Sequence, residues 1–236
     1  MQTRNERPTI RAAIFDFDFT LADSSNGIFD CAITALSAMA LPPATRAAIN
    51  STIGLSLRES FTRLTGDATP ARREDFVRHF HARADQVMVS SAVIYDFVPE
   101  AVAKLRAQGL TLAVASTKRR IHIEEILKRD NIDDAFVAII GGSDVQNQKP
   151  HPESLQAAMN QLKVSPEECL YIGDSVVDAE AAERAQMNFV AVLTGVTARA
   201  DFAAYPVRAT LNHAGELPSW LISDRPKGRG LLRPPT

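Results

Sequence analysis

Residues 10–20 read IRAAIFDFDFT, an apolar run that becomes acidic at its end. This pattern predicts a buried strand over residues 10–17 that carries carboxylates to its carboxyl end. Because alternate side chains of a strand point to the same side, Asp16 and Asp18 are expected to lie close enough to act together. The stretch therefore predicts both a central strand and a pair of neighbouring carboxylates.

Beyond residue 98, apolar runs alternate with helical patterns. Helices are expected over 99–108, 119–131, 152–163 and 176–187, and strands over 110–115, 136–140, 169–172 and 189–193. This alternation is typical of a parallel sheet with helices on both faces. With the first strand added, we predict an α/β fold with a Rossmann-like, doubly wound sheet of five parallel strands.

Residues 24–91 change to helical periodicity, which Pro42-Pro43, Gly54 and the stretch 66–70 divide into about four helices. The sequence therefore predicts a helical unit inserted after the first strand. Residues 1–22 and 98–223 are expected to form the α/β core, and 23–97 the helical insertion. Residues 224–236 are expected to be a disordered tail because basic side chains alternate there with Pro and Gly.

The composition favours an ordinary globular protein that handles a small molecule. Of 236 residues, 45% are hydrophobic and 23% charged, and the net charge of −2 provides no long-range attraction to nucleic acid or an anionic membrane. No stretch has the length of a signal or membrane-spanning segment, so a cytoplasmic location is expected. Cys31 and Cys169 are expected to be buried free thiols. The sequence leaves monomer and dimer open.

Polar side chains gather where four of the predicted strands end, and ligands of open α/β sheets bind at this edge. The candidates are Asp16, Asp18, Ser116, Thr117, Lys149, Asp174 and Asp178. Converging carboxylates repel one another unless a divalent cation neutralises them, and hard oxygen ligands favour Mg²⁺. Hydroxyl and ammonium groups suit phosphate oxygens, and a carboxylate can itself attack phosphorus. The edge therefore predicts a site for Mg²⁺ and a phosphate.

The order of these residues resembles the haloacid dehalogenase-like (HAD) superfamily. The four motifs are Asp16-x-Asp18-x-Thr20, Ser116, Lys149 and Gly173-Asp174-x-x-x-Asp178. The helical insertion resembles the four-helix, type C1 cap of the phosphoglycolate phosphatase-like branch, with further likeness in 53–60 (IGLSLRES), 149–153 (KPHPE) and 193–195 (LTG). The resemblance covers residues 10–222 and implies a Rossmann-like core with a cap domain.

The resemblance implies a role for each acidic residue. Asp16 would attack the phosphorus, and Asp18 would protonate the leaving alkoxide and then activate water. Mg²⁺ would be held by Asp16, by Asp18 through its backbone carbonyl, and by Asp174. Asp178 would either contact the ion directly or support the residues that do.

The resemblance also assigns the remaining polar candidates. Ser116, Thr117 and Lys149 would contact phosphate oxygens, and Thr20 would orient the first motif. Arg58 in the cap is the candidate for substrate selection, although a solvated helix face explains this residue as well.

Two positions depart from the family pattern, since Phe19 and Gln186 stand where most members carry glycine. The expected function is a Mg²⁺-dependent phosphatase of small phosphorylated metabolites, with a phosphoglycolate-like monoester as first candidate. Three alternatives stay open: a sugar-phosphate phosphomutase on the same core, a pyrophosphatase, and a catalytically silent binding module, which the substitution at Phe19 motivates.

Overall fold

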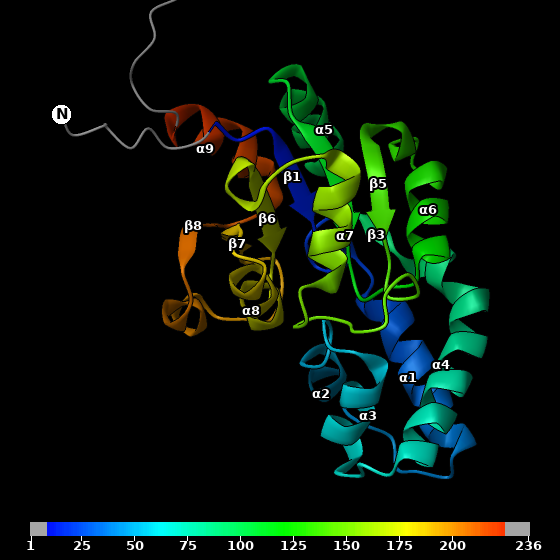
Figure 1. Ribbon diagram of the computed structural model, residues 1–236. Coiled ribbons are helices and arrows are strands. Elements are labelled where there is room, and N and C mark those ends of the chain that lie inside the picture. The colour runs from blue at the N-terminus through cyan, green and yellow to red at the C-terminus, as the bar shows by residue number, and fades with distance from the viewer. Residues whose placement is uncertain (1–8, 225–236) are drawn as a thin grey trace, which may run out of the picture.

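A parallel sheet forms the centre of the computed structural model, which describes residues 9–224. Its strands are β1 (Ala12–Phe15), β4 (Thr111–Ala115), β5 (Phe136–Ile140), β6 (Cys169–Gly173), β7 (Asn188–Val192) and β8 (Val207–Leu211). They follow the order β5-β4-β1-β6-β7-β8, and every neighbouring pair is parallel (Figure 1). The chain winds outward from β1 in both directions, so the crevice expected in doubly wound sheets lies at the end of β1.

Helices cover both faces of this sheet. One face packs against α5 (Val98–Ala107), α6 (Arg120–Arg129) and α9 (Leu217–Asp224), and the other against α7 (Glu153–Leu162) and α8 (Val176–Arg184). Alternate residues of β1 serve the two layers: Ala13 and Phe15 join the first core, and Ala12 and Ile14 the second. All four are buried, which explains why the strand appears in the sequence as a continuous apolar run.

Four helices follow β1 and precede residue 93 in the chain: α1 (Ser25–Ala38), α2 (Arg46–Asn50), α3 (Leu57–Thr65) and α4 (Pro70–Ser91). We call residues 25–91 the helical unit. It has its own apolar core, which includes Leu36, Ile49, Phe61 and Phe76. The chain enters through β2 (Ala22–Asp23) and leaves through β3 (Val93–Ile94), which pair antiparallel. The unit lies below the carboxyl ends of the sheet strands in Figure 1.

Local sequence explains the limits of these helices. At the start of α3, the Ser56 hydroxyl accepts from the Glu59 backbone N–H and the Glu59 carboxylate accepts from the Ser56 backbone N–H. The same helix ends at Gly66, whose φ of 76° is readily adopted only without a Cβ. α4 begins with Pro70, whose missing N–H costs nothing in a first turn.

The predicted fold class is confirmed, but five strands was one too few. The strand β8 was missed because it lies at the edge of the sheet, where four of its five residues are only half-buried, so its sequence has no continuous apolar run. Short 3₁₀ helices complete the fold: η1 (Asp133–Ala135), η2 (Pro166–Glu168), η3 (Arg199–Ala204) and η4 (Ala214–Glu216).

Other expectations concern single residues and the termini. Cys31 and Cys169 are both buried free thiols, as predicted. Within residues 9–224, no helix combines the length and apolar character needed to cross a bilayer. Of the predicted tail, Asp224 is the last residue of α9, and 225–236 lie outside the described residues, as do residues 1–8.

The end of α8 provides a stability prediction. Gln186 follows this helix with a φ of 56°, and the next residue, Met187, donates its backbone N–H to Ala182. A side chain in this left-handed conformation costs about 1 kcal/mol relative to glycine, and Gln186 is exposed, so nothing offsets the cost. We expect Gln186→Gly to raise the free energy of unfolding by about 0.5–1 kcal/mol. Urea denaturation checks this, and an unchanged or lower midpoint would contradict it.

Candidate functional site

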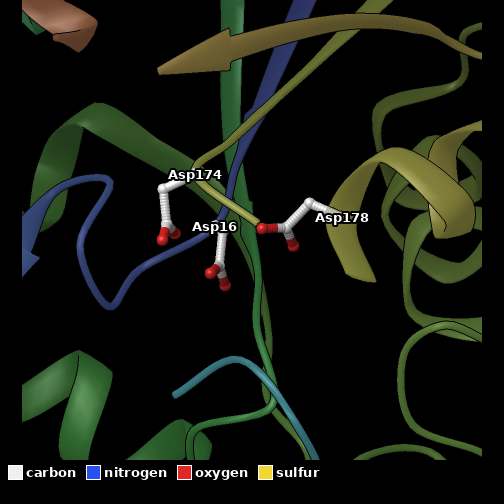
Figure 2. A group of neighbouring side chains, drawn as sticks. All are labelled: Asp16, Asp174 and Asp178. Atoms are coloured by element: carbon white, nitrogen blue, oxygen red, sulfur yellow. The ribbon is translucent and has the colours of Figure 1, made fainter. Parts of the chain in front are cut away.

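Three buried carboxylates meet at the carboxyl end of the sheet. Asp16 follows β1, Asp174 follows β6, and Asp178 lies in the first turn of α8. One oxygen from each lies within 4.8 Å of the other two, and Figure 2 shows the three side chains gathered around one space. They come together because β1 and β6 are adjacent and parallel, so that their carboxyl ends reach the same edge.

Lys149 is the cation within this cluster. Its Nζ lies 2.9 Å from Asp16 Oδ1 and 2.5 Å from Asp178 Oδ1, and the side chain is buried. It also donates to the Tyr171 hydroxyl at 2.8 Å, and that hydroxyl lies 2.9 Å from the same Asp178 oxygen. Burial acts to lower the pKa of Lys149, but the charges of Asp16 and Asp178 outweigh it and raise the pKa above its ordinary value. The ammonium group therefore stays charged at neutral pH.

Asp18 lies apart from the three clustered carboxylates and has its own cation. Lys118 Nζ, from the loop after β4, donates to Asp18 Oδ1 at 2.8 Å and lies 3.2 Å from Met88 Sδ in the helical unit. Both charged side chains are almost fully buried. Asp16 and Asp18 contact different lysines, and because β1 ends at Phe15 the strand alternation that predicted them on one side does not extend to them.

The charges of this region do not balance. Asp16, Asp18, Asp174 and Asp178 face two lysines, which leaves a formal charge of −2 when all groups are ionised. Burial, only partly offset by Lys149, raises the pKa of Asp16 to about 6. Burial, reinforced by Asp178 and Asp16, raises the pKa of Asp174 well above its ordinary value. A divalent cation would supply the missing charge, and the carboxylate oxygens are the donors that hard cations prefer. The residues present therefore fit such an ion.

Two glycines allow the backbone to approach these carboxylates. A Cβ at Gly173 would lie 2.6 Å from the Asp178 carboxylate, and one at Gly195 would lie 1.9 Å from Asp174 Oδ2. Neither space can hold a methyl group. The Asp178 carboxylate is further fixed by Ser175, whose hydroxyl donates to Asp178 Oδ2 at 2.6 Å and whose backbone N–H donates to the same oxygen. The cluster is thus preorganised by backbone as well as by charge.

The other predicted site residues lie at different distances from the cluster. Thr20 is buried and donates its hydroxyl to Asp174 Oδ1 at 3.4 Å. Ser116 is buried at the end of β4, where its hydroxyl accepts the Lys118 backbone N–H. Thr117 follows it in the wall of a cavity described below. Arg58 lies at the start of α3 in the same wall, and its guanidinium forms a bidentate ion pair with Glu74.

The loop that contains Phe19 keeps the conformation for which glycine is suited. Phe19 has a φ of 60°, its N–H donates to the Ala22 carbonyl at 2.7 Å, and its own carbonyl accepts from the Thr194 hydroxyl. The strain of a left-handed aromatic residue costs on the order of 1–3 kcal/mol, and burial of the ring offsets part of it. The departure from the family pattern therefore leaves the turn after Asp18 intact.

Sequence reasoning missed Tyr171 as a site residue and left the role of the Lys118 side chain open. Tyr171 lies within the apolar run of β6, where an aromatic residue is ordinarily core, and only the hydroxyl distinguishes it from phenylalanine. Its position three residues before Asp174 could have indicated this role. The hydroxyl of a tyrosine at that position of the strand can reach the carboxyl edge of the sheet, where the carboxylates lie. The contact between Lys118 and Asp18 depends on the adjacency of β4 and β1, which the sequence does not show.

Comparisons with known proteins agree with this geometry. The family model for haloacid dehalogenase-like hydrolases matches residues 13–192. "Probable phosphatase IndB" of Dickeya dadantii is 33% identical over 188 residues, covering 78% of this chain and 81% of that protein. A phosphoglycolate phosphatase of Colwellia psychrerythraea is 32% identical and covers 81% of this chain and 88% of its own length.

A solved structure extends the similarity to three dimensions. A Bacteroides fragilis protein described as a haloacid dehalogenase-like hydrolase has a TM-score of 0.86 and 39% identity, and the match covers 89% of this chain and all of that one. Fold, motif order and clustered carboxylates thus agree with the sequence comparisons. The chain belongs to the family of haloacid dehalogenase-like hydrolases.

Proposed function

We propose that this protein is a Mg²⁺-dependent phosphatase that hydrolyses phosphate monoesters of small metabolites through an aspartyl-phosphate on Asp16. The observation that carries the proposal is the cluster of Asp16, Asp174 and Asp178 around a buried Lys149. Relatives named as phosphatases support the reaction class. In this proposal residues 1–22 and 98–223 form the catalytic core, and 23–97 form a cap over it.

The first half of the reaction transfers the phosphoryl group to the enzyme. A carboxylate oxygen of Asp16 attacks the phosphorus, the bond between phosphorus and the ester oxygen breaks, and the proton of Asp18 passes to the departing alkoxide. Lys149 holds Asp16 in place and offsets negative charge. Asp16, Asp174 and the Asp18 backbone carbonyl would hold Mg²⁺, with Asp178 supporting them. Bound Mg²⁺ would neutralise the approaching phosphate oxygens.

The second half returns the enzyme to its starting state. Asp18, now a carboxylate, takes a proton from water, and the water oxygen attacks the phosphorus of the aspartyl-phosphate. The bond between Asp16 and phosphorus breaks, which releases inorganic phosphate and restores the Asp16 carboxylate. Ser116 and Thr117 would bind phosphate oxygens in both halves, and Thr20 would hold Asp174 in position. The cap would exclude bulk water while the leaving group departs.

Phosphate release from a panel of substrates tests the proposal. The panel contains phosphoglycolate, sugar phosphates, nucleoside monophosphates and pyrophosphate, each with and without Mg²⁺, and Asp16→Asn controls for contaminating phosphatase. We expect Mg²⁺-dependent release that the variant lacks. Conversion of a sugar monophosphate to its isomer would instead indicate a mutase, and best turnover of pyrophosphate a pyrophosphatase. If neither turnover nor Mg²⁺ binding is found, the silent binding module is the correct description.

Mg²⁺ is also expected to stabilise the folded protein. A ligand at about 100 times its Kd adds about 2.7 kcal/mol, which for a chain of this length corresponds to a rise in Tm of about 5–10 °C. Thermal denaturation with Mg²⁺ and with EDTA checks this. Asp174→Asn should abolish the rise, because it removes one carboxylate of the cluster. Equal Tm values for the wild type in Mg²⁺ and EDTA would show that the cluster does not hold the ion.

A further inference from the structure

A cavity of about 250 Å³ lies between the helical unit and the carboxyl ends of the sheet strands. Its wall on the core side includes Asp18, Thr117 and Lys118, so the cavity begins beside the proposed general acid. The opposite wall is built by the helical unit and is mainly apolar, with Ile28, Ile53, Leu57, Val77, Phe80 and Met88 among its side chains. A leaving group that departs from phosphorus and takes a proton from Asp18 would enter this space.

The three lysine and arginine side chains in the wall already have anionic partners. Arg58 pairs with both carboxylate oxygens of Glu74, and Lys118 pairs with Asp18. Arg119 Nη1 lies 2.6 Å from Asp85 Oδ1. A carboxylate on the substrate would therefore meet only cations whose charge is already offset by a protein carboxylate, so it would gain less from them than from an unpaired cation.

Several uncharged polar groups of the cavity wall are satisfied within the protein. The Thr52 hydroxyl donates to the Ile49 carbonyl at 2.7 Å, and the Ser60 hydroxyl lies 3.0 Å from the Ser56 carbonyl. Burial lowers the pKa of His122 below its ordinary value, so its ring is neutral at neutral pH, and its Nε2 lies 3.0 Å from Asp85. On the helical side, apolar side chains outnumber the polar ones, which are Thr52, Arg58, Ser60 and His81.

We infer that the substrate is a phosphate monoester of an uncharged, largely apolar alcohol, whose aliphatic or aromatic part fills this cavity. The inference rests on the proposed phosphatase function and specifies its substrate class. An apolar cavity of about 150 Å³ can hold benzene, so the space here accommodates a ring or a chain of several carbons. Glycolate has only one carbon besides its carboxylate, so it would leave most of this apolar space unfilled, and its charge would meet only cations that already have a carboxylate partner.

Primary alkyl esters test this inference because their leaving groups differ mainly in apolar length. We compare kcat/KM for ethyl phosphate, n-pentyl phosphate and phosphoglycolate in the presence of Mg²⁺. The three additional methylenes of the pentyl ester are expected to raise kcat/KM on the order of 100-fold over the ethyl ester. Phosphoglycolate is expected to fall below the ethyl ester. Equal or better turnover of phosphoglycolate relative to n-pentyl phosphate would overturn the inference.

A variant of the cavity wall provides the converse test. Val77 is half-buried in the apolar wall, and Val77→Lys would introduce a cation without a partner already in place. The ratio of kcat/KM for n-pentyl phosphate to that for phosphoglycolate should fall at least about 10-fold. Ala71→Lys, at an exposed position of the same helix, is the matched control and should leave the ratio unchanged. If Val77→Lys does not fold, Val77→Asn takes its place. Val77→Asn should lower turnover of n-pentyl phosphate and leave turnover of phosphoglycolate unchanged.

Binding measurements separate failure of the inference from failure of the proposed function. n-Pentylphosphonate and ethylphosphonate have no ester bond to hydrolyse, and calorimetry with Mg²⁺ present measures their affinities. In one outcome, the pentyl compound has a Kd lower by at least about 10-fold and no ester is turned over. This outcome would disprove the phosphatase function and support the apolar binding site. Turnover without a preference for the longer ester or phosphonate would retain the phosphatase and disprove the apolar site.

Discussion

Replacement of Asp16 by asparagine is expected to reduce phosphate release by about 10⁴-fold or more, with little change in Tm. The amide has no anionic oxygen with which to attack phosphorus, and loss of a nucleophile has effects of this size in other hydrolases. The fold should persist because asparagine has nearly the same volume and Lys149 keeps its contact with Asp178. Initial rates on the best substrate of the panel and circular dichroism melting curves provide the two measurements.

A matched control distinguishes this site from a general effect of removing a carboxylate. Asp134 lies in η1 with 77% of its side chain exposed, and it contacts Arg106 only at 3.4 Å. Asp134→Asn should therefore leave both the rate and the Tm near the wild-type values. If Asp16→Asn keeps a tenth of the wild-type rate, the covalent route through Asp16 is wrong, even if the protein remains a phosphatase.

Replacement of Lys149 by methionine is expected to have the largest effect on stability. It leaves Asp16, Asp174 and Asp178 buried together with no lysine between them, and removal of one partner from a buried ion pair costs about 3–5 kcal/mol. Methionine fills a similar volume, so the loss reports charge rather than packing. Urea denaturation in EDTA measures the change without a bound cation, and phosphate release should also be lost.

Neutralising a carboxylate beside position 149 should restore part of the stability that Lys149→Met removes. In the double variant Lys149→Met with Asp178→Asn, one of the two carboxylates that contact the lysine becomes neutral, so we expect stability to recover by more than 1 kcal/mol. Lys104→Met is the surface control, because its pair with Glu100 is exposed to solvent, where ion pairs contribute little to stability. A Lys149→Met variant as stable as Lys104→Met would show that Lys149 does not compensate the cluster.

The proposed apolar site changes the meaning of the similarity to phosphoglycolate phosphatases. In the proposed function, the residues that handle phosphate lie after β1, β4, β5 and β6. The cavity wall comes mainly from the helical unit, so it can differ between proteins while the core chemistry stays the same. Arg58, which the sequence nominated for substrate selection, lines this wall but is paired with Glu74. Similarity between the α/β cores of these proteins therefore identifies the type of reaction more securely than it identifies the substrate.

Much of the core could be predicted because burial leaves a direct record in the sequence. The buried residues 12–15 of β1 form a continuous apolar run, and the alternation of strands and helices after residue 98 predicts a parallel sheet. By contrast, β8 lies at the sheet edge and is only half-buried, so its pattern resembles that of a loop. At the opposite edge, β5 also exposes a side chain, Val137, but its sequence FVAII keeps a continuous apolar run and was predicted. An apolar run, which VRATL in β8 lacks, therefore decided which edge strand could be predicted.

The sequence alone determined the α/β fold class and the proximity of Asp174 and Asp178, because these residues are about one helical turn apart at the start of α8. Only the tertiary structure decided which lysine contacts which carboxylate. Lys118 reaches Asp18 across 100 residues, and Lys149 reaches Asp178 across 29. The apolar cavity likewise depends on how the helical unit packs against the sheet. Such contacts arise from the packing of distant segments, which no local period in the sequence encodes.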